Sequence, residues 1–341
     1  SEANDTALKL IRYYWNLKGK PHKKIHLSRE YGYHGVTFAA ASLSGLGPMH
    51  AQWDLPLPGF EKVPAPYWYG AKQAGYGDVA PAEFGLLIAG KLEERILELG
   101  PENIASFSAE PVQGAGGLIF PPPTYWHEVQ RICGRYDVLL HLDEVITGFG
   151  RTGEWFGAQT WRIAPDIMTM AKGLSSGYQP ISAVSLGVRM ADVILEADEE
   201  LVHGFTTSGH PVACAVALKN LEVIARMGLV PRVKTNTGPY LQQRLAETFA
   251  DHPLVGEVRG QGLLAAVELV RDRTERKFFP DPGVIGTLCR NYCLEEGLIC
   301  RAVRDTMVLA PPLVTQASEI DEIVAKLGTA IDRTAKDCGK L

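Results

Sequence analysis

Apolar residues recur along the first part of the chain in two patterns, a helical spacing and short uninterrupted runs. Over residues 5–17 apolar side chains lie three or four positions apart, which predicts a helix that ends before Gly19 and Pro21. Short apolar strands and further helices are expected after it, with the strands at 104–109, 138–142, 167–170 and 181–186 and helices at 88–99 and 126–136. Short apolar strands separated by helices indicate a mostly parallel sheet covered on both faces.

The pattern changes after a helix that is expected to start near Pro211. Helices are predicted at 230–249, 285–296 and 318–334, and strands at 255–258, 263–269 and 307–309. We interpret this order as an α+β layer and predict a large domain over 1–228 and a smaller domain over 229–341. Residues 44–82 are rich in Gly, Pro and aromatics, so we expect a long irregular segment that lines a site or an interface.

Composition and charge narrow the class of protein. The 34 basic and 39 acidic residues leave a net charge of -5, and their even distribution argues against nucleic acid or an anionic membrane as partner. No stretch approaches the roughly 18 consecutive apolar residues of a membrane span. Six cysteines without a CxxC pair favour reduced thiols in a cytoplasmic protein. Because the chain opens at Ser1 with no Met, we expect it to begin within a domain, which leaves an upstream targeting segment open.

Two acidic residues follow the apolar run at 138–142. Asp143 and Glu144 therefore lie at the carboxyl edge of the predicted sheet, where open α/β folds bind ligands. This position is also compatible with a simple helix cap. The GFGRTG segment that follows matches GxGxxG, but it starts five residues after the strand, and Pro165 leaves little room for a helix. The sequence therefore does not predict a dinucleotide site.

A lysine follows the next strand, at 167–170. The spacing alone leaves two interpretations of Lys172: a surface lysine, or an amine in a dry pocket whose lowered pKa makes it a nucleophile towards aldehydes. A carboxylate and a lysine at neighbouring strand ends are what a pyridoxal enzyme needs. The lysine forms the imine, and the carboxylate keeps the pyridine nitrogen protonated.

The run LDEVITGFGRTGEWFGAQ…APDIMTMAKGLSSGYQPISAV resembles the signature of the class III (ω-) aminotransferases. Other motifs follow in the family's order: SEANDTALKL, GYHGVTFAAASL, EPVQGAGG, HGFTTSGHPVACA, VGEVRGQGLLAAVEL and GLICRAVRDTMVLAPPLV. The PLPG and PYWYG segments are similar to the amine– or polyamine–pyruvate branch. The resemblance implies the α/β fold of aspartate-aminotransferase-like transferases, here N-terminally truncated relative to the family, with pyridoxal 5′-phosphate (PLP) as cofactor.

The resemblance also assigns roles to residues around the cofactor. It implies that Asp143 pairs with the pyridine nitrogen and that Lys172 binds the cofactor and shuttles the proton. Val145 would pack on one face of the ring, and Tyr33 of the Tyr-His-Gly motif on the other. Glu110 of Glu-Pro-Val-Gln-Gly would orient the cofactor as a polar neighbour.

Four further positions concern the phosphate and the substrate. Ser1 begins a helix whose N-terminal N–H groups suit a phosphate, and in the family the residues before this serine supply much of that cup. Thr206 matches the threonine that binds the phosphate of the partner subunit's cofactor. Arg301 matches a mobile arginine that binds carboxylates bidentately and swings away for an uncharged amine. Arg304 stands where the family usually has glycine, so it either alters carboxylate binding or faces solvent.

Taken alone, several of these residues have ordinary structural explanations. Tyr33 is compatible with core, Glu110 with a strand-end cap and Thr206 with a helix cap, but the pair Asp143 and Lys172 favours the functional roles. The histidines are expected to be packed or hydrogen-bonded rather than catalytic, and no pair has metal-ligand spacing: His34, His141 and His210.

The function implied is a ping-pong transamination from an ω-amine or ω-amino acid, such as a diamine, a monoamine or β-alanine, to a keto acid such as pyruvate. A homodimer or tetramer is expected, with Thr206 acting across the interface. Two alternatives stay open at this point: another class III reaction, an aminomutase or decarboxylase, and a truncated non-catalytic dimerisation protein.

Overall fold

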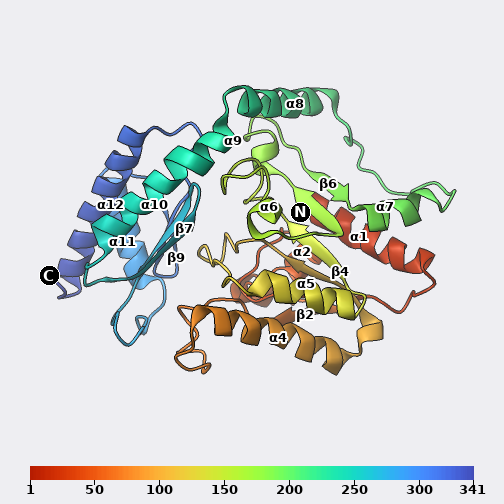
Figure 1. The fold of residues 1–341 in the computed structure, drawn as a ribbon, viewed down its shortest axis with the longest axis horizontal. Coiled ribbons are helices and arrows are strands. Elements are labelled where there is room, and N and C mark those ends of the chain that lie inside the picture. The colour runs from red at the N-terminus through yellow and green to blue at the C-terminus, as the bar shows by residue number, and fades with distance from the viewer.

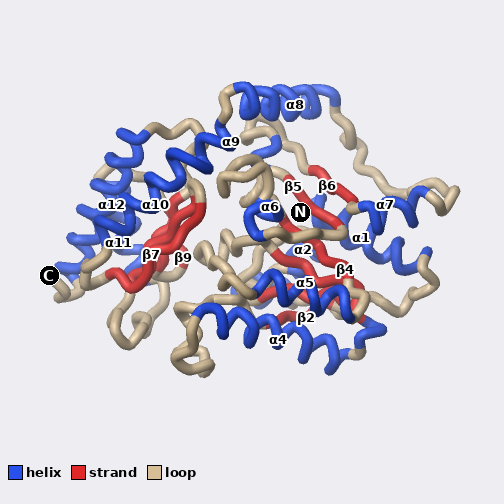
Figure 2. The backbone as a smooth tube through the Cα atoms, viewed as in Figure 1, coloured by secondary structure: helices blue, strands red, loops and turns tan.

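The strands of the protein form two separate sheets, in a computed structural model that describes residues 1–341 (Figures 1 and 2). The first sheet has six strands in the order β2-β1-β3-β4-β5-β6, and every neighbouring pair is parallel except β5 and β6. Its strands are β1 (Ile25–Arg29), β2 (Phe60–Val63), β3 (Ile104–Ala109), β4 (Leu139–Asp143), β5 (Ile167–Met170) and β6 (Ala183–Leu186).

Helices cover both faces of this sheet, α1 (Glu2–Leu17) and α7 (Val188–Leu195) on one side, α4 (Pro81–Leu99) and α5 (Tyr125–Arg135) on the other (Figure 1). The side chains of β4 alternate between the two faces of the sheet, because successive residues of a strand point to opposite faces. Leu140 and Leu142 pack with α4 and α5, whereas Leu139 packs with α1. The alternation therefore turns Asp143 to the face that α1 covers.

The second sheet has four antiparallel strands in the order β7-β8-β10-β9. They are β7 (Val255–Gln261), β8 (Leu264–Leu269), β9 (Arg301–Val303) and β10 (Thr306–Leu309). One face packs against α10 (Gly238–Phe249), α11 (Val284–Glu295) and α12 (Ala317–Asp337). The other face turns Leu264 and Ala266 towards Val112 and Leu118, which follow β3, so the two sheets meet there.

The remaining helices connect these layers: α2 (Phe38–Leu43), α3 (Gly47–Trp53), α6 (Gly157–Trp161), α8 (Pro211–Arg226) and α9 (Leu229–Arg232). Between α8 and α9, Gly228 adopts φ 60°, a left-handed conformation that favours glycine. The predicted division at residue 228 falls at this turn, and as a domain boundary it stays a prediction. No helix has both the length and the apolar character needed to cross a membrane.

The predicted α/β fold with a mostly parallel sheet is confirmed, but two of its strands were not expected. The strand β1 was missed because it carries His26, Ser28 and Arg29, which are polar yet buried. The interpretation of 44–82 as wholly irregular was wrong, since α3 and β2 lie within it. The strand β2 pairs with β1 in parallel, and tertiary pairing, not an apolar run, specifies both.

Candidate active site

The side chain of Asp143 lies at the carboxyl end of β4 and is only 4 % exposed. Its Oδ2 accepts hydrogen bonds from His34 Nδ1 at 2.8 Å and from Asn4 Nδ2 at 3.0 Å. The backbone N–H of Val145 donates to Oδ1 at 3.1 Å. Burial by itself would raise the pKa of Asp143, but the bonds from His34 and Asn4 outweigh it and lower the pKa to about 2. The carboxylate is thus buried and ionised.

A chain of hydrogen bonds leads from Asp143 back through the sheet. The hydroxyl of Thr169 donates to Asn4 Oδ1 at 3.0 Å, so His141 Nε2, 3.3 Å from the same hydroxyl, must act as a donor to it. Burial lowers the pKa of His141 to about 4, which leaves its Nδ1 free to accept from Ser108 Oγ at 2.9 Å. Every hydrogen in this chain therefore points towards Asp143, and aligned donors stabilise negative charge.

Sequence reasoning gave His34 and Asn4 no part in the site, although the structure bonds both to Asp143. The partners are 109 and 139 residues away from Asp143 along the chain, so no local spacing pointed to them. The one available signal was the position of His34 directly after Tyr33.

The neighbouring acid, Glu144, has a different environment. It is buried and accepts bonds from Thr147 Oγ1 at 2.5 Å and from the backbone N–H groups of Gly157 at 2.9 Å and Ala158 at 2.6 Å. These bonds hold the start of α6. Glu144 is therefore engaged in holding the start of α6, which leaves Asp143 as the candidate partner of a cofactor.

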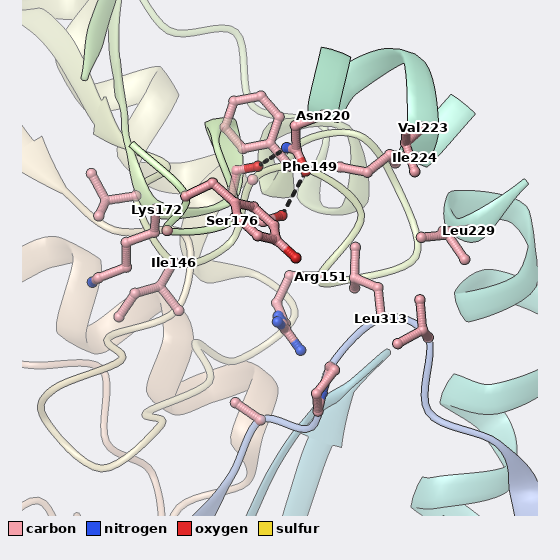
Figure 3. A pocket seen from close by; sticks show the side chains of 18 of the residues that line it. Ile146, Phe149, Arg151, Lys172, Ser176, Asn220, Val223, Ile224, Leu229 and Leu313 are labelled. Atoms are coloured by element: carbon pink, nitrogen blue, oxygen red, sulfur yellow. Dashed lines mark hydrogen bonds between the residues drawn. The ribbon is translucent and has the colours of Figure 1, made fainter. Parts of the chain in front are cut away.

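Lys172 begins a tight turn directly after β5, with φ 38°, which is a left-handed and strained conformation for a lysine. Asn220 of α8 fixes this turn by donating to the carbonyl oxygens of Gly173 at 2.8 Å and Leu174 at 3.0 Å. Ser176 Oγ in turn donates to Asn220 Oδ1 at 2.7 Å (Figure 3). The position of Lys172 is thus set by a helix that follows it in the sequence.

Lys172 is exposed as a residue, yet the atoms packed around its amine change the acidity of that amine. Burial lowers the pKa of Lys172, the charges of Asp143 and Glu110 oppose that shift, and the charge of Arg301 adds to it. A lysine with a lowered pKa holds more of its neutral, nucleophilic form at neutral pH. The charges of Asp143, Glu110 and Arg301 thus all act on this amine.

Glu110 follows β3 directly and ties two loops together. Its Oε1 accepts from the backbone N–H of Tyr33 at 3.2 Å, and its Oε2 accepts from the N–H of Gly114 at 2.8 Å. Burial raises the pKa of Glu110 although the charges of His34 and Arg29 oppose that shift. Tyr33, half-buried, is therefore held beside a carboxyl group close to Asp143 and Lys172.

Ser1 occupies the cap position of α1, and its Oγ accepts from the N–H of Val36 at 3.0 Å. No side chain caps the N–H groups in the first turn of this helix, which has 16 residues. A helix N-terminus of this kind attracts anions such as phosphate. Since Asn4 belongs to the same first turns, the end of the helix and Asp143 lie in one region.

The remaining predicted residues lie on exposed segments. Thr206 lies in the loop between α7 and α8, is exposed, and forms no hydrogen bond with the group around Asp143. Arg301 is the exposed first residue of β9. Arg304 is half-buried, and one of its N–H groups, on Nη2, donates to the carbonyl oxygen of Gly116 at 3.0 Å.

A cavity of about 760 Å³ lies between the two sheets, next to α8, and Val145 and Lys172 form part of its wall (Figure 3). Most of its lining is apolar, and Arg151 is its other charged residue. In Figure 3 the amino group of Lys172 points away from Arg151 and Leu313. The cavity is therefore adjacent to the Lys172 amine but does not contain the Asp143 side of the site.

These groups match the three parts of pyridoxal 5′-phosphate. An ionised carboxylate suits a protonated pyridine nitrogen, and of the roughly four acceptor positions on Asp143, three are taken by His34, Asn4 and Val145. The Lys172 amine suits the aldehyde, and the uncapped N-terminus of α1 suits the phosphate. The residues present therefore fit this cofactor.

Comparison with known proteins agrees with this chemistry. The sequence model of the family described as Aminotransferase class-III matches residues 1–331. The putrescine–pyruvate aminotransferase of Pseudomonas aeruginosa is 51% identical over 335 residues, which cover 98% of this chain and 72% of that protein. The diaminobutyrate–2-oxoglutarate transaminase of Halomonas elongata is 45% identical over 340 residues, with 98% and 72% covered.

A solved structure extends the likeness to three dimensions. The crystal structure of the omega transaminase from Pseudomonas jessenii in complex with PMP has a TM-score of 0.95 at 46% identity, covering 100% of this chain and 75% of that chain. The predicted family, fold class, enzyme class and cofactor are thereby confirmed. We conclude that the chain belongs to the class III aminotransferases, which use pyridoxal 5′-phosphate to carry out transamination.

Proposed function

We propose that this protein transfers the amino group of an ω-amine or ω-amino acid to a keto acid such as pyruvate, with Lys172 and Asp143 as its catalytic residues. The observation that carries the proposal is the combination of a buried, ionised Asp143 with a Lys172 amine whose pKa is lowered by burial. Bound PLP would supply an aldehyde for the amines and a ring that withdraws electrons when its nitrogen is protonated.

The residues of this chain would divide the work as follows. Asp143 keeps the proton on the pyridine nitrogen, and Lys172 Nζ binds the cofactor and takes the proton from the amine-bearing carbon of the donor. Val145 and Tyr33 would cover the two faces of the ring. Glu110 would orient Tyr33, since it accepts the N–H of that residue.

Arg301 is proposed to bind the carboxylate of the keto acid. Its exposed position at the start of β9 leaves the guanidinium free to fork onto a carboxylate, and its charge reaches Lys172. The choice of a diamine-like donor and pyruvate is supported by the name of the Pseudomonas aeruginosa relative. The Halomonas elongata relative is named for 2-oxoglutarate, which is also a keto acid.

We also propose that the protein works in the cytoplasm as a homodimer in which Thr206 binds the phosphate of the partner subunit's cofactor. The segment around Thr206 supports this, because it exposes apolar side chains that a second copy would cover. These residues are Leu201, Val202, Phe205, Val212 and Leu218. Ser1, at the uncapped N-terminus of α1, would bind the phosphate of its own subunit's cofactor.

Borohydride reduction followed by peptide mapping tests the assignment of Lys172. The reduced protein should carry the cofactor covalently on Lys172 and lose its yellow colour. Two other lysines make the test sharp, because burial also lowers the pKa of Lys23 and of Lys62 to about 8. If a lowered pKa alone decided the reaction, these lysines would be modified as well. An adduct on either in place of Lys172 would overturn the assignment.

The need for a keto acid separates transamination from an aminomutase or a decarboxylase. The amine-loaded enzyme should turn over only when a keto acid is added, and the keto acid should be converted to the amino acid in equal amount. Steady turnover without a keto acid would contradict the proposal.

A further inference from the structure

Arg304 occupies a turn between β9 and β10 in a conformation that favours glycine. Its φ is 52°, and a side chain with a Cβ is strained there. A strained residue persists when its surroundings hold it in place. The side chain of Arg304 is half-buried, so it can form interactions that compensate for this strain.

The guanidinium of Arg304 leaves its own sheet and contacts loops that belong to the other one. Its Nη2 donates to the carbonyl oxygen of Gly116 at 3.0 Å. Its Cζ lies 4.6 Å from the centroid of the Tyr31 ring and 5.7 Å from that of Tyr67, both within the range of a cation–π contact. The positive charge is therefore engaged by two aromatic faces and a carbonyl oxygen.

The contacts of Arg304 adjoin the two segments that hold Glu110. Tyr31 lies two residues before Tyr33, whose N–H donates to Glu110 Oε1, and Gly116 lies two residues after Gly114, whose N–H donates to Oε2. The two segments also touch directly, because a Cβ added to Gly116 would lie 2.8 Å from the carbonyl oxygen of Tyr31. Arg304 thus contacts both segments at the point where Tyr31 and Gly116 already touch.

A second arginine of the same sheet also holds this loop, but it does not duplicate the role. Arg259 donates to the carbonyl oxygens of Gly117 at 2.7 Å and Leu118 at 2.8 Å, and it pairs with Glu268 at 2.8 Å. Arg259 shares the Tyr67 ring with Arg304, at 5.3 Å from the centroid, but forms no hydrogen bond or cation–π contact with Tyr31 or Gly116. Arg304 is therefore the arginine that joins the β9–β10 turn to the Tyr31 segment.

We propose that Arg304 is a positioning residue that fixes Tyr33 and Glu110 relative to the turn that follows Arg301, and that it does not bind the substrate carboxylate. The inference rests on the proposed function for its effect on catalysis, but not for its structural part. Because Tyr33 and Glu110 would serve both halves of the reaction, the loss of Arg304 should affect both halves alike.

The structural part is tested by amide hydrogen exchange of the cofactor-loaded protein with Arg304→Gly. Glycine relieves the strain of the turn, so the variant should fold, while residues 114–119 should exchange about tenfold faster. Arg276→Gly is the matched control, because Arg276 also has φ 52° and stacks on an aromatic ring, Trp68, at 4.7 Å. That control should leave the exchange of 114–119 unchanged.

Tyr31→Leu examines the same contact from its other side. It should accelerate exchange of 114–119, and adding it to Arg304→Gly should produce little further increase, because both remove one interaction. Arg304→Lys keeps the charge and should restore part of the protection. Unchanged exchange at 114–119 in both Arg304→Gly and Tyr31→Leu would overturn the inference, whatever the enzyme's activity.

The catalytic part is tested by the kinetics of the two half-reactions. Arg304→Gly should lower the rate constants of the amine half and the keto acid half by similar factors, with little change in KM for the keto acid. An increase of that KM alone would overturn the inference and make Arg304 a carboxylate receptor. Failure of the proposed function would appear separately, as an absence of either half-reaction in the unmodified protein.

Discussion

Replacement of Asp143 by asparagine should slow the amine half-reaction by at least about 100-fold, or about 2.7 kcal/mol of barrier. The structure explains why an amide is a poor substitute. Oδ2 of Asp143 accepts from both His34 and Asn4, and Oδ1 accepts from the N–H of Val145. An asparagine must turn its NH₂ group towards one of these donors, and it carries no charge to hold a proton on the pyridine nitrogen.

The hydrogen-bond chain behind Asp143 gives a graded version of the same experiment. Thr169→Val removes the donor to Asn4 Oδ1, a neutral bond worth about 1 kcal/mol, so the rate should fall by no more than about fivefold. Ser108→Ala removes a hydrogen bond that lies two steps further from Asp143 in this chain, so it should lower the rate less. Thr169→Ser keeps the hydroxyl and removes only the methyl group, so it is the control for altered packing at this position.

The assay is the single-turnover reaction of the cofactor-loaded enzyme with an amine donor, followed by the absorbance of the cofactor. The order of effects should be Asp143→Asn, then Thr169→Val, then Ser108→Ala. A near-normal rate for Asp143→Asn would mean that another group holds the pyridine proton. A Thr169→Val variant as slow as Asp143→Asn would refute the assignment of the electrostatic effect to the carboxylate.

Two further predictions concern the substrate and acid stability. Arg301→Ala should raise KM for pyruvate about 10- to 150-fold and change amine kinetics much less; equal damage to both half-reactions, measured separately, would indicate a structural arginine. Burial lowers the pKa of His26 to about 3 and that of His141 to about 4, so both stay neutral in the fold although the unfolded chain protonates them near pH 6.5. Their contribution to the free energy of unfolding is fully present above pH 6.5 and is lost as the pH falls towards 4 for His141 and towards 3 for His26. Asp143 adds a loss between about pH 3.8 and about pH 2. The free energy of unfolding, measured with urea, should therefore be lower at pH 5 than at pH 7, and His26→Gln should make this difference about 2 kcal/mol smaller. A difference in the variant equal to that of the unmodified protein would contradict this.

The sequence was sufficient for the parts of the site that local patterns encode. Asp143 and Lys172 each follow a short apolar strand, and the carboxyl ends of parallel strands meet at one edge of a sheet. Their roles stay predictions, but β4 and β5 are neighbouring parallel strands with Asp143 opposite Thr169, so Asp143 and Lys172 lie at the same edge of the sheet. The location of Thr206 and Arg301 on exposed segments leaves their roles to be tested with the partner subunit and substrate present.

The parts that could not be predicted depend on pairing between distant segments. The strand β1 has no apolar run. Its polar residues His26 and Ser28 can be buried because they are hydrogen-bonded to Ser106 and Lys62. In the sequence, Asn4 is an ordinary polar residue near the start of a helix, and its role becomes visible only when α1 packs on the sheet. Its two N–H groups then reach Asp143 and the carbonyl oxygen of His34, at 3.0 Å and 2.6 Å.

The alternation of side chains along β4 explains which of the two adjacent acids can serve the cofactor. Asp143 shares a strand face with Leu139, and α1 covers that face. Asn4 of α1 therefore reaches Asp143 and donates a hydrogen bond that helps to keep the carboxylate ionised. Glu144 comes after the strand ends and is taken up by the backbone N–H groups at the start of α6. Exchanging the two roles would require the strand to shift by one residue, which would also turn Leu140 and Leu142 away from α4 and α5. The hydrophobic packing that fixes the register of β4 therefore also fixes the position of the Asp143 carboxylate.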